Sequence, residues 1–309
     1  MQWKGHMKLK VILNNKSLLI LAIIAFYSLT SESLVYAKSF EAWKKSYAKR
    51  ASKRGLPKKF VLEVLSKVKL DKSVIEKDRN QIILSKEHNY NHFMKRWLRE
   101  DNERVKKGKT LLKEHHKLLS KIEKRYKVDK EAIVSLWGVE TFYGEIVGDY
   151  NVIQSLATLA YDGRRKRFFE IQLNAALRLI KKGHVKFEDF KGSWAGATGQ
   201  CQFMPSNIPV YGQDFNKDGK IDLWGSKEDI FASIAYFLKR VGWKKGKSIG
   251  SLIFKSKHKY RSRKTASEIP MKDSPIIIQG KNFNPLLKWN NSTLFAAFNI
   301  LLIKAFKSN

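Results

Sequence analysis

Apolar residues recur at helical spacing through most of this 309-residue chain, and this periodicity constrains the fold more than any other feature. From Phe40 to about Trp97 they form short amphipathic helices, which are interrupted at Gly55-Leu56-Pro57. One long amphipathic helix is expected to include Leu111 and Ile122, with histidines that pack or face solvent rather than bind metal. Further helices are expected at about 133–147, 229–241 and 292–306, and short β-like pieces lie between 244 and 281. The sequence therefore predicts an α+β fold that is predominantly α-helical.

Charge is the second constraint, because the 61 Lys and Arg residues outnumber the 28 Asp and Glu residues and give a formal net charge of +33. With 43% hydrophobic residues the chain can still bury a core, so this charge does not indicate disorder. A basic surface attracts polyanions. The sequence contains no nucleic-acid-binding motif, so no nucleic acid partner is expected. The lone Cys201 excludes a disulfide framework and is interpreted as a packing residue.

The first 37 residues have the pattern of a secretory signal peptide. Four lysines precede an apolar run from about Ser17 to Leu29, and Ala37 supplies the small residue for cleavage. The run is shorter than the roughly 20 residues that span a bilayer, and no later stretch reaches that length. We expect cleavage after Ala37 and a periplasmic mature chain without a membrane span; the alternative is an uncleaved N-terminal anchor.

A single glutamate lies on the apolar face of the expected helix 133–147. Ile133, Trp137, Glu140 and Gly144 share one face of that helix. Burial raises the pKa of a carboxyl, as a general acid near neutral pH requires. Gly138 and Gly144 are expected to let a ligand approach the helix closely. The alternative interpretation is a structural Glu140 that pairs with a buried Arg or a backbone amide.

The segment from Asp214 to Asp222 resembles the start of an EF-hand calcium loop. Oxygen ligands stand at positions 1, 3 and 5 (Asp214, Asn216 and Asp218), followed by Gly at position 6 and the carbonyl of Lys220 at position 7. Position 12 is Gly rather than Glu, so a standard loop is incomplete. The alternative is a metal-free turn rich in Asp and Asn.

Two long motifs carry a resemblance to a known family. Segments 136–144 (LWGVETFYG) and 192–206 (GSWAGATGQCQFMPS) resemble the lytic murein transglycosylases of the B type. Segments 78–81, 214–224, 282–283 and 289–292 stand in the order that the family shows. The resemblance covers nearly all of the chain after residue 37 and implies a lysozyme-like catalytic core.

The resemblance implies cleavage of the β-1,4 bond between N-acetylmuramic acid and N-acetylglucosamine in the glycan strands of peptidoglycan. Glu140 matches the single catalytic glutamate, which acts first as an acid and then as a base. The muramoyl C6 hydroxyl closes a 1,6-anhydro ring, and neither water nor an organic cofactor takes part. A hydrolase usually needs a second carboxylate; Glu145 is expected to point about 140° away on the helix.

Other site residues follow from the resemblance one by one. Ser193 and Gln202 match positions that line the sugar cleft, although capping of the loop explains both equally well. Arg164 and Arg165 match a basic pair that faces the substrate, and the alternative is a solvated charge run. Asn290 matches an asparagine near the glutamate.

For the metal, the family has a longer calcium loop in which a later acid completes the shell. Here that acid is Asp229 or Glu228. The resemblance therefore implies structural Ca²⁺, and binding would stabilise the fold.

We therefore expect a signal peptide (1–37), a helical N-terminal part (38–127), a catalytic core with the calcium loop (128–243) and a β element with a final helix (244–309). A lytic transglycosylase is the main expectation. A hydrolytic muramidase on the same fold and a noncatalytic cationic cell-wall-binding protein are the alternatives. Other cell-wall enzymes or envelope machinery are conceivable partners besides peptidoglycan.

Overall fold

The computed structural model describes residues 39–84, 102–253 and 276–308. The predicted signal peptide and the last part of the predicted N-terminal helical segment, residues 85–97, lie outside these ranges. The chain divides into two compact units, residues 1–62 and 63–309.

In the first unit, residues 39–52 form a helix. Its aromatic residues stack at the predicted helical spacing, with ring centroids 5.6 Å apart for Phe40 and Trp43 and 5.2 Å apart for Trp43 and Tyr47. The helix ends in a turn at Gly55, which has a φ of 83° that favours glycine. Helix α2 (Lys58–Ser66) then begins directly after Pro57.

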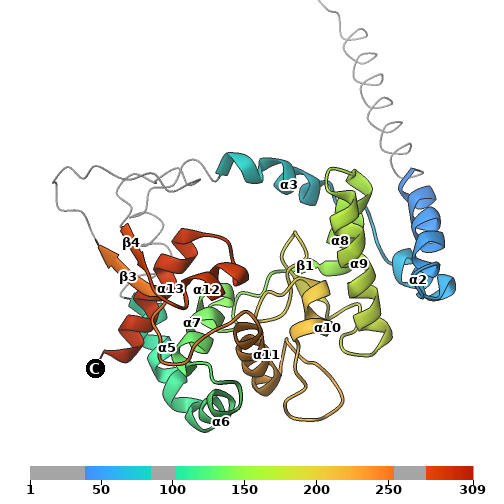
Figure 1. Ribbon diagram of the computed structural model, residues 1–309. Coiled ribbons are helices and arrows are strands. Elements are labelled where there is room, and N and C mark those ends of the chain that lie inside the picture. Colours follow the sequence, from blue (N-terminus) through green and yellow to red (C-terminus); the bar gives the residue numbers. More distant parts are fainter. Residues whose placement is uncertain (1–38, 85–101, 254–275, 309) are drawn as a thin grey trace, which may run out of the picture. The chain divides into compact units, whose positions relative to one another are not determined.

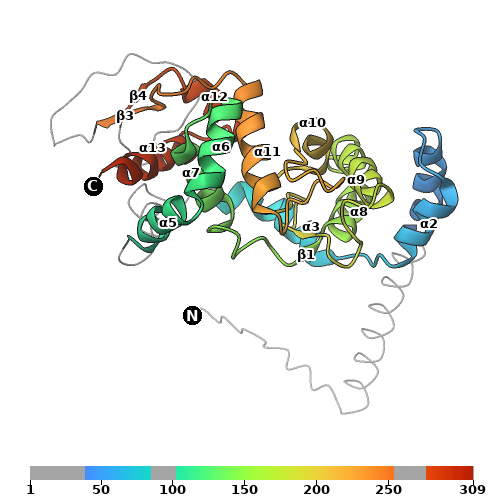
Figure 2. The same ribbon diagram turned by 90° about the horizontal axis from the view of Figure 1, so that it is seen from below.

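The second unit is built mainly of helices (Figures 1 and 2). Its helices are α3 (Lys72–Leu84), α5 (Glu103–Glu114), α6 (His116–Tyr126), α7 (Lys130–Thr141), α8 (Val152–Asp162), α9 (Lys166–Lys181), η2 (Pro205–Asn207), α10 (Ile208–Tyr211), α11 (Lys227–Arg240), α12 (Phe283–Trp289) and α13 (Thr293–Lys307). Helix α8 packs against α9, and α3 packs against α8. Helices α5, α6, α11 and α13 all contact α7, which forms the centre of this unit.

The expectation of one long helix from Leu111 to Ile122 is wrong, because the chain breaks at His115 into α5 and α6. His115 leaves helical geometry with φ −94° and ψ 17°. Its ring packs against Trp137, with centroids 6.1 Å apart, and against Phe231, with centroids 5.4 Å apart. The break lets α5 contact α13 while α6 contacts α11. His115 is half-buried and packs against the core, one of the two positions expected for it.

Helix α7 is buried on nearly all sides, since every residue from Ala132 to Val139 is inaccessible to solvent. A helix that is apolar all round is typical of a core position. The predicted helix extended to Val147, but α7 ends at Thr141 because Phe142 and Tyr143 adopt left-handed geometry with φ 50° and 64°. Glu140 therefore lies in the last turn of the central helix.

Two small antiparallel sheets complete the fold. Strand β1 (Tyr150–Asn151) pairs with β2 (Lys191–Gly192), so the chain before α8 lies beside the start of the glycine-rich motif. Strand β3 (Gly250–Ile253) pairs with β4 (Ile276–Gln279). The mainly helical α+β class is confirmed.

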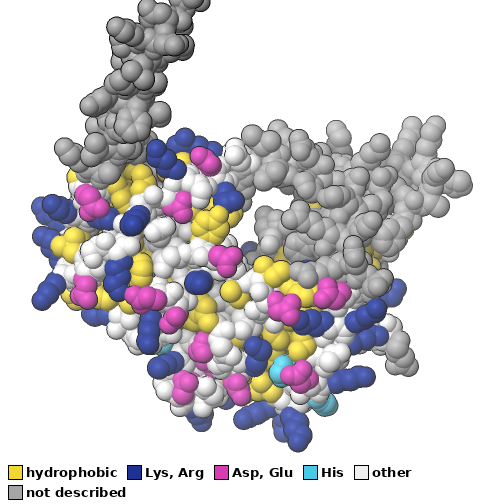
Figure 3. All heavy atoms as spheres, turned by 180° about the vertical axis from the view of Figure 1, so that it is seen from behind, with side chains coloured by type: hydrophobic (Ala, Val, Ile, Leu, Met, Phe, Trp, Pro, Cys, Tyr) yellow, Lys and Arg dark blue, Asp and Glu magenta, His cyan; other side chains and the backbone are white. Residues whose placement is uncertain are grey.

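The surface in Figure 3 carries Lys and Arg side chains spread between apolar patches. Within the described ranges, no helix is both long and apolar enough to cross a membrane.

Candidate active site

Glu140 is largely buried at the end of α7, and its carboxylate has one hydrogen-bond donor in Trp289. The indole Nε1 of Trp289 donates to Oε1 of Glu140 at 2.6 Å. Burial raises the pKa of Glu140 to about 7, although the hydrogen bond from Trp289 acts in the opposite direction. Among the ion pairs of the described residues, none involves Glu140. Pairing of Glu140 with a buried Arg, one half of the structural alternative that also included a backbone amide, is therefore not found within the described ranges.

Trp289 is held by an aromatic cluster. Its ring centroid lies 4.8 Å from that of Phe237 on α11 and 5.2 Å from that of Phe203, which belongs to the glycine-rich motif, segment 192–206. The sequence analysis singled out the neighbouring Asn290 and missed Trp289. The signal was present, because Trp289 begins the segment 289–292 on which part of the resemblance rests.

The turn after Glu140 is fixed by contacts with the glycine-rich motif. Thr141 Oγ1 donates to the carbonyl of Gln200 at 2.8 Å and accepts the N–H of Gly144 at 3.0 Å. Gly144 has a φ of +91°, and a Cβ there would lie 2.3 Å from Oε1 of Gln200. Only glycine fits without displacing one of these groups.

Gln200 connects four segments and was also missed by the sequence analysis. Its Nε2 donates to the carbonyl of Trp224 at 2.6 Å, while its Oε1 accepts from Trp137 Nε1 at 2.9 Å and from Lys227 Nζ at 3.3 Å. The Lys227 ammonium also lies 5.3 Å from the ring centroid of Trp137, and burial lowers its pKa. A buried amide with all these partners fixes the position of the turn beside Glu140.

The space beside the two glycines expected to admit a ligand, Gly138 and Gly144, is instead occupied by other side chains of the protein. A Cβ on Gly138 would lie 2.5 Å from Cε1 of Tyr143, just as one on Gly144 would meet Gln200. Tyr143 donates from its hydroxyl to the carbonyl of Arg104 at 2.6 Å, and Arg104 donates to the carbonyl of Gly138. These glycines therefore allow close packing around the turn that follows Glu140. Their predicted role in ligand approach is wrong.

Ser193 and Gln202 brace the glycine-rich loop. Ser193 Oγ accepts the N–H of Ala197 at 3.1 Å, and Gln202 Nε2 donates to the carbonyls of Val147 at 3.0 Å and Gly199 at 3.1 Å. These are the loop-capping contacts that the sequence analysis gave as the alternative; contact with a sugar stays a prediction.

Cys201, between Gln200 and Gln202, is fully buried, in keeping with a packing role. Burial and the nearby Glu140 both raise the pKa of its thiol.

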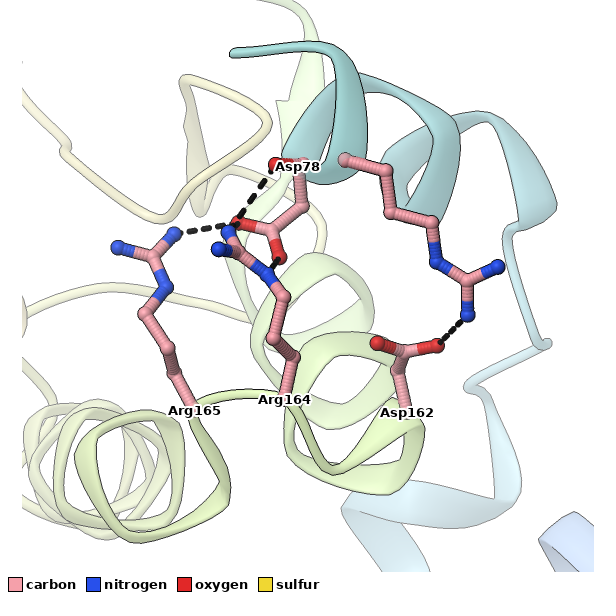
Figure 4. Close-up of polar contacts among 5 residues, drawn as sticks. Asp78, Asp162, Arg164 and Arg165 are labelled. Carbon is pink, nitrogen blue, oxygen red and sulfur yellow. Dashed lines mark hydrogen bonds and ion pairs between the residues drawn. The ribbon is translucent and has the colours of Figure 1, made fainter. Parts of the chain in front are cut away.

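Arg164 and Arg165 converge on the buried Asp78 of α3 (Figure 4). Arg164 donates from Nε to Oδ2 of Asp78 at 2.5 Å, and Arg165 pairs with the other carboxylate oxygen. Burial alone would raise the pKa of Asp78, but the hydrogen bonds from both arginines hold it below its usual value. Beside them, Arg79 pairs with Asp162 at 2.7 Å. The basic pair thus joins α3 to the segment between α8 and α9.

Asn290, the last predicted substrate residue, is exposed directly after α12. Its N–H donates to the carbonyl of Leu286 at 3.2 Å, and its own carbonyl accepts from Ser292 at 2.8 Å. It directly follows Trp289, the residue that donates a hydrogen bond to Glu140.

The predicted calcium loop is folded around its own acidic side chains. Asp214 accepts the N–H groups of Asp218 at 3.1 Å and Gly219 at 2.9 Å. The buried Asp229 closes the loop from α11, accepting from Phe215 at 2.8 Å and Asp222 at 2.9 Å.

Burial raises the pKa of Asp229, and the nearby Asp214 adds to this effect. Carboxylates gathered in this way suit a hard cation such as Ca²⁺. In the described part of the chain, three acidic side chains outside this loop, Glu123, Asp129 and Glu131, have oxygens within 4.8 Å of one another.

Comparison with known proteins identifies the family. The model of the transglycosylase SLT domain matches residues 39–302, and the chain belongs to this family. Membrane-bound lytic murein transglycosylase B of Escherichia coli (strain K12) is 31% identical over 209 residues. That match covers 65% of this chain and 57% of the relative, so the chain spans little more than half of the relative's length.

Solved structures agree with this assignment. SltB3 from Pseudomonas aeruginosa in complex with NAG-NAM-pentapeptide is 32% identical, with a TM-score of 0.76 over 87% of this chain and 80% of that one. The Escherichia coli lytic transglycosylase Slt35 in complex with calcium is 25% identical, with a TM-score of 0.69 over 85% of this chain and 92% of that one. The resemblance to B-type lytic transglycosylases is confirmed.

Proposed function

We propose that the chain is a lytic transglycosylase that cleaves the β-1,4 bond between N-acetylmuramic acid and N-acetylglucosamine in peptidoglycan. The observation that carries the proposal is Glu140, a carboxyl with a pKa of about 7 at the end of the core helix. SltB3, which has the same fold, was solved with NAG-NAM-pentapeptide and with NAG-anhNAM-pentapeptide, and these ligands support the substrate class.

In this mechanism Glu140 serves as acid and then as base. The protonated carboxyl gives its proton to the glycosidic oxygen as the bond from that oxygen to C1 of the muramoyl residue breaks. The carboxylate then takes the proton of the C6 hydroxyl, whose oxygen bonds to C1 and closes the anhydro ring. A pKa near the working pH keeps both protonation states accessible.

The neighbouring acids support the route without water. Glu145 lies beyond the end of α7, where it is more than half exposed and pairs with Lys107. Asp162, the last residue of α8, accepts a hydrogen bond from Arg79 on α3. Both acids thus have other partners, whereas a hydrolase would need a free carboxylate beside the sugar.

We assign the substrate contacts to residues next to the catalytic turn. Ser193, Gln202 and Asn290 keep polar atoms that can bind the sugar and its N-acetyl group. Arg164 and Arg165 retain partly exposed guanidinium groups while bound to Asp78, so either can take a peptide carboxylate only as an additional partner.

We also propose structural calcium in the loop. Asp214, Asn216, Asp218, the carbonyl of Lys220 and Asp229 would hold it, with Glu228 as the alternative to Asp229. Mutual repulsion between Asp214 and Asp229 supports a cation there, since a positive charge would relieve it. Bound calcium would cross-link the loop to the start of α11.

For the chain as a whole, we propose the organisation expected from the sequence: residues 1–37 as a cleaved signal peptide, 38–127 as a helical N-terminal part, 128–243 as the catalytic core and 244–309 as its completion. Export would place the protein in the periplasm, where its substrate is found. The lysine-rich pattern of the first residues supports this location.

Mass spectrometry of fragments released from purified peptidoglycan tests the activity. We expect anhydro products, lighter by one water than hydrolytic ones, from the native chain and none from Glu140→Gln. Reducing-end products would instead show a muramidase. Binding of peptidoglycan without release by either protein would show a noncatalytic wall-binding protein.

A further inference from the structure

A concavity of about 580 Å³, lined mainly by lysines, lies outside the active site. Tyr126 and Trp243 contribute its aromatic surface. We call it the lysine pocket, and its six lysines, all exposed, are Lys127, Lys239, Lys244, Lys245, Lys247 and Lys281.

The loop that carries three of these lysines is fixed by two buried side chains. Asp129 accepts Nε1 of Trp243 at 2.9 Å and the N–H of Gly246 at 3.0 Å. Asn282 accepts the N–H of Lys244 at 2.8 Å and donates to the carbonyls of Lys244 at 2.9 Å and Lys247 at 2.6 Å. The backbone of these lysines is therefore already fixed, and binding of a ligand would have to order only their side chains.

Only one of these ammonium groups forms an ion pair within the described ranges. Lys245 lies 3.5 Å from a carboxylate oxygen of Glu123, and none of the other five has such a partner there. Two more acids, Asp129 and Glu131, have oxygens within 4.8 Å of one another and of Glu123. Asp129 accepts hydrogen bonds from Trp243 and Gly246 with both of its oxygens.

Helix capping explains only part of the cluster. Lys239 and Lys127 stand at the C-terminal ends of α11 and α6, where cations stabilise the helix dipole. Lys247 lies in a connecting segment, and Lys281 precedes the N-terminal end of α12, where the helix dipole disfavours a cation.

We propose that the lysine pocket binds an anion that carries two or more phosphate groups. A terminal phosphate has a charge of about −1.5 to −2 near neutral pH, so two or three balance five ammonium groups. Carboxylates, with one charge each, would need twice the number in the same space. An ammonium acts as a point charge, which suits phosphate without the bidentate geometry that Arg provides for carboxylates.

The pocket and the catalytic glutamate lie at opposite ends of two helices. Asp129 precedes α7 and Glu140 ends it, while Asn282 precedes α12 and Trp289 ends it. At 1.5 Å per residue these helices separate the two sites by about 10–16 Å. An anion in the pocket would therefore leave Glu140 accessible, and the proposal does not depend on the proposed enzymatic function.

Isothermal titration calorimetry of the purified full chain tests the site by measuring its affinity for tripolyphosphate. The affinity for citrate, a tricarboxylate, is measured at equal ionic strength for comparison. We expect tripolyphosphate to bind at least about tenfold more tightly than citrate. The variant Lys244→Gln/Lys247→Gln/Lys281→Gln should weaken binding of tripolyphosphate at least about tenfold. A matched control is Lys181→Gln/Lys182→Gln/Lys186→Gln, which removes the same charge from exposed lysines around the end of α9 and should change binding less than about twofold.

Equal losses in both triple variants would overturn the proposal, because they would show a response to net charge alone. Citrate binding as tight as tripolyphosphate binding would also overturn it. Lys127→Gln/Lys239→Gln removes two charges from helix ends and gives a second test that leaves the loop intact.

Vesicles distinguish the source of the phosphate. Binding to vesicles with cardiolipin, whose headgroup carries two phosphates, but not to phosphatidylcholine vesicles, lost in the variant Lys244→Gln/Lys247→Gln/Lys281→Gln, would identify a lipid headgroup. Binding of tripolyphosphate without binding to either vesicle would identify a soluble phosphate compound.

Discussion

Trp289 donates its indole N–H to Glu140 at 2.6 Å, although 149 positions separate the two residues in the sequence. This hydrogen bond stabilises the ionised carboxylate, while burial favours the protonated form. The two effects together set a pKa suited to a group that must give and then take a proton.

Replacing this donor should shift the pH dependence of catalysis. Trp289→Phe removes the N–H and keeps an aromatic ring, so the pKa of Glu140 should rise and the alkaline limb of the kcat/KM profile should move to higher pH. Trp243→Phe is the matched control, because that indole also donates to a carboxylate, Asp129 at 2.9 Å. An unchanged limb in Trp289→Phe would refute the role given to the hydrogen bond.

The raised pKa also predicts how stability depends on pH. The folded state holds a proton on Glu140 up to about pH 7, whereas the unfolded chain releases it near pH 4.5. The stabilisation is therefore complete below the unfolded pKa and is lost as the pH rises through about 7. Between pH 5 and pH 8 the native chain should lose about 2 kcal/mol of unfolding free energy relative to Glu140→Gln, measured by urea denaturation. Parallel curves for the two proteins would contradict this.

Gly144 should tolerate no side chain. Gly144→Ala combines a φ of +91° with a Cβ 2.3 Å from Gln200, and we expect a loss of about 2–4 kcal/mol of unfolding free energy together with most of the activity. Gly183→Ala is the control, since Gly183 has a φ of +76° but nothing within 4 Å of the added Cβ. Its cost should be only about 1 kcal/mol. Similar losses at both positions would show that backbone strain alone matters.

Asp78 should stabilise the fold through its ion pairs with Arg164 and Arg165. Asp78→Asn leaves Arg164 and Arg165 without their common partner and should lower the thermal unfolding midpoint by about 5 °C at neutral pH. Because the pKa of Asp78 is lowered, this contribution is lost as the pH falls through the folded-state pKa, and the difference from the native chain should shrink in acid. Asp189→Asn, which changes an exposed carboxylate, should leave the midpoint unchanged.

Removal of calcium should destabilise the chain. Chelator should lower the thermal unfolding midpoint, and added Ca²⁺ should restore it. Asp218→Asn should abolish the response to Ca²⁺ while leaving the buried Asp229 in place. No change in the native chain under chelator would refute the metal assignment.

The local spacing of apolar residues was enough to predict much of the fold. Spacing alone located the core helix and the final helix, where the hydroxyl of Ser292 accepts the N–H of Phe295 as an N-cap. The break at His115 could not be predicted this way, because Leu111 to Ile122 keeps helical periodicity on both sides of it. The break depends on packing against Trp137 and Phe231, which are distant in the sequence.

The residues of the candidate active site also fall into two groups, those predictable from local sequence and those that were not. Glu140 was predictable, since a carboxylate on an apolar stripe is a local signal. Trp289 and Gln200 were not, because each acts through partners from other elements. The arginine pair shows the same limit: nothing near Arg164 in the sequence indicates that Asp78 will lie against it.

The contact between Glu140 and Trp289 has a consequence for when activity can arise. During synthesis the core helix leaves the ribosome long before α12 has been made. Until that last segment docks, the glutamate lacks its indole donor and the ring cluster around it. A nascent or C-terminally clipped chain would therefore carry the proposed catalytic residue without the surroundings on which the proposed activity depends.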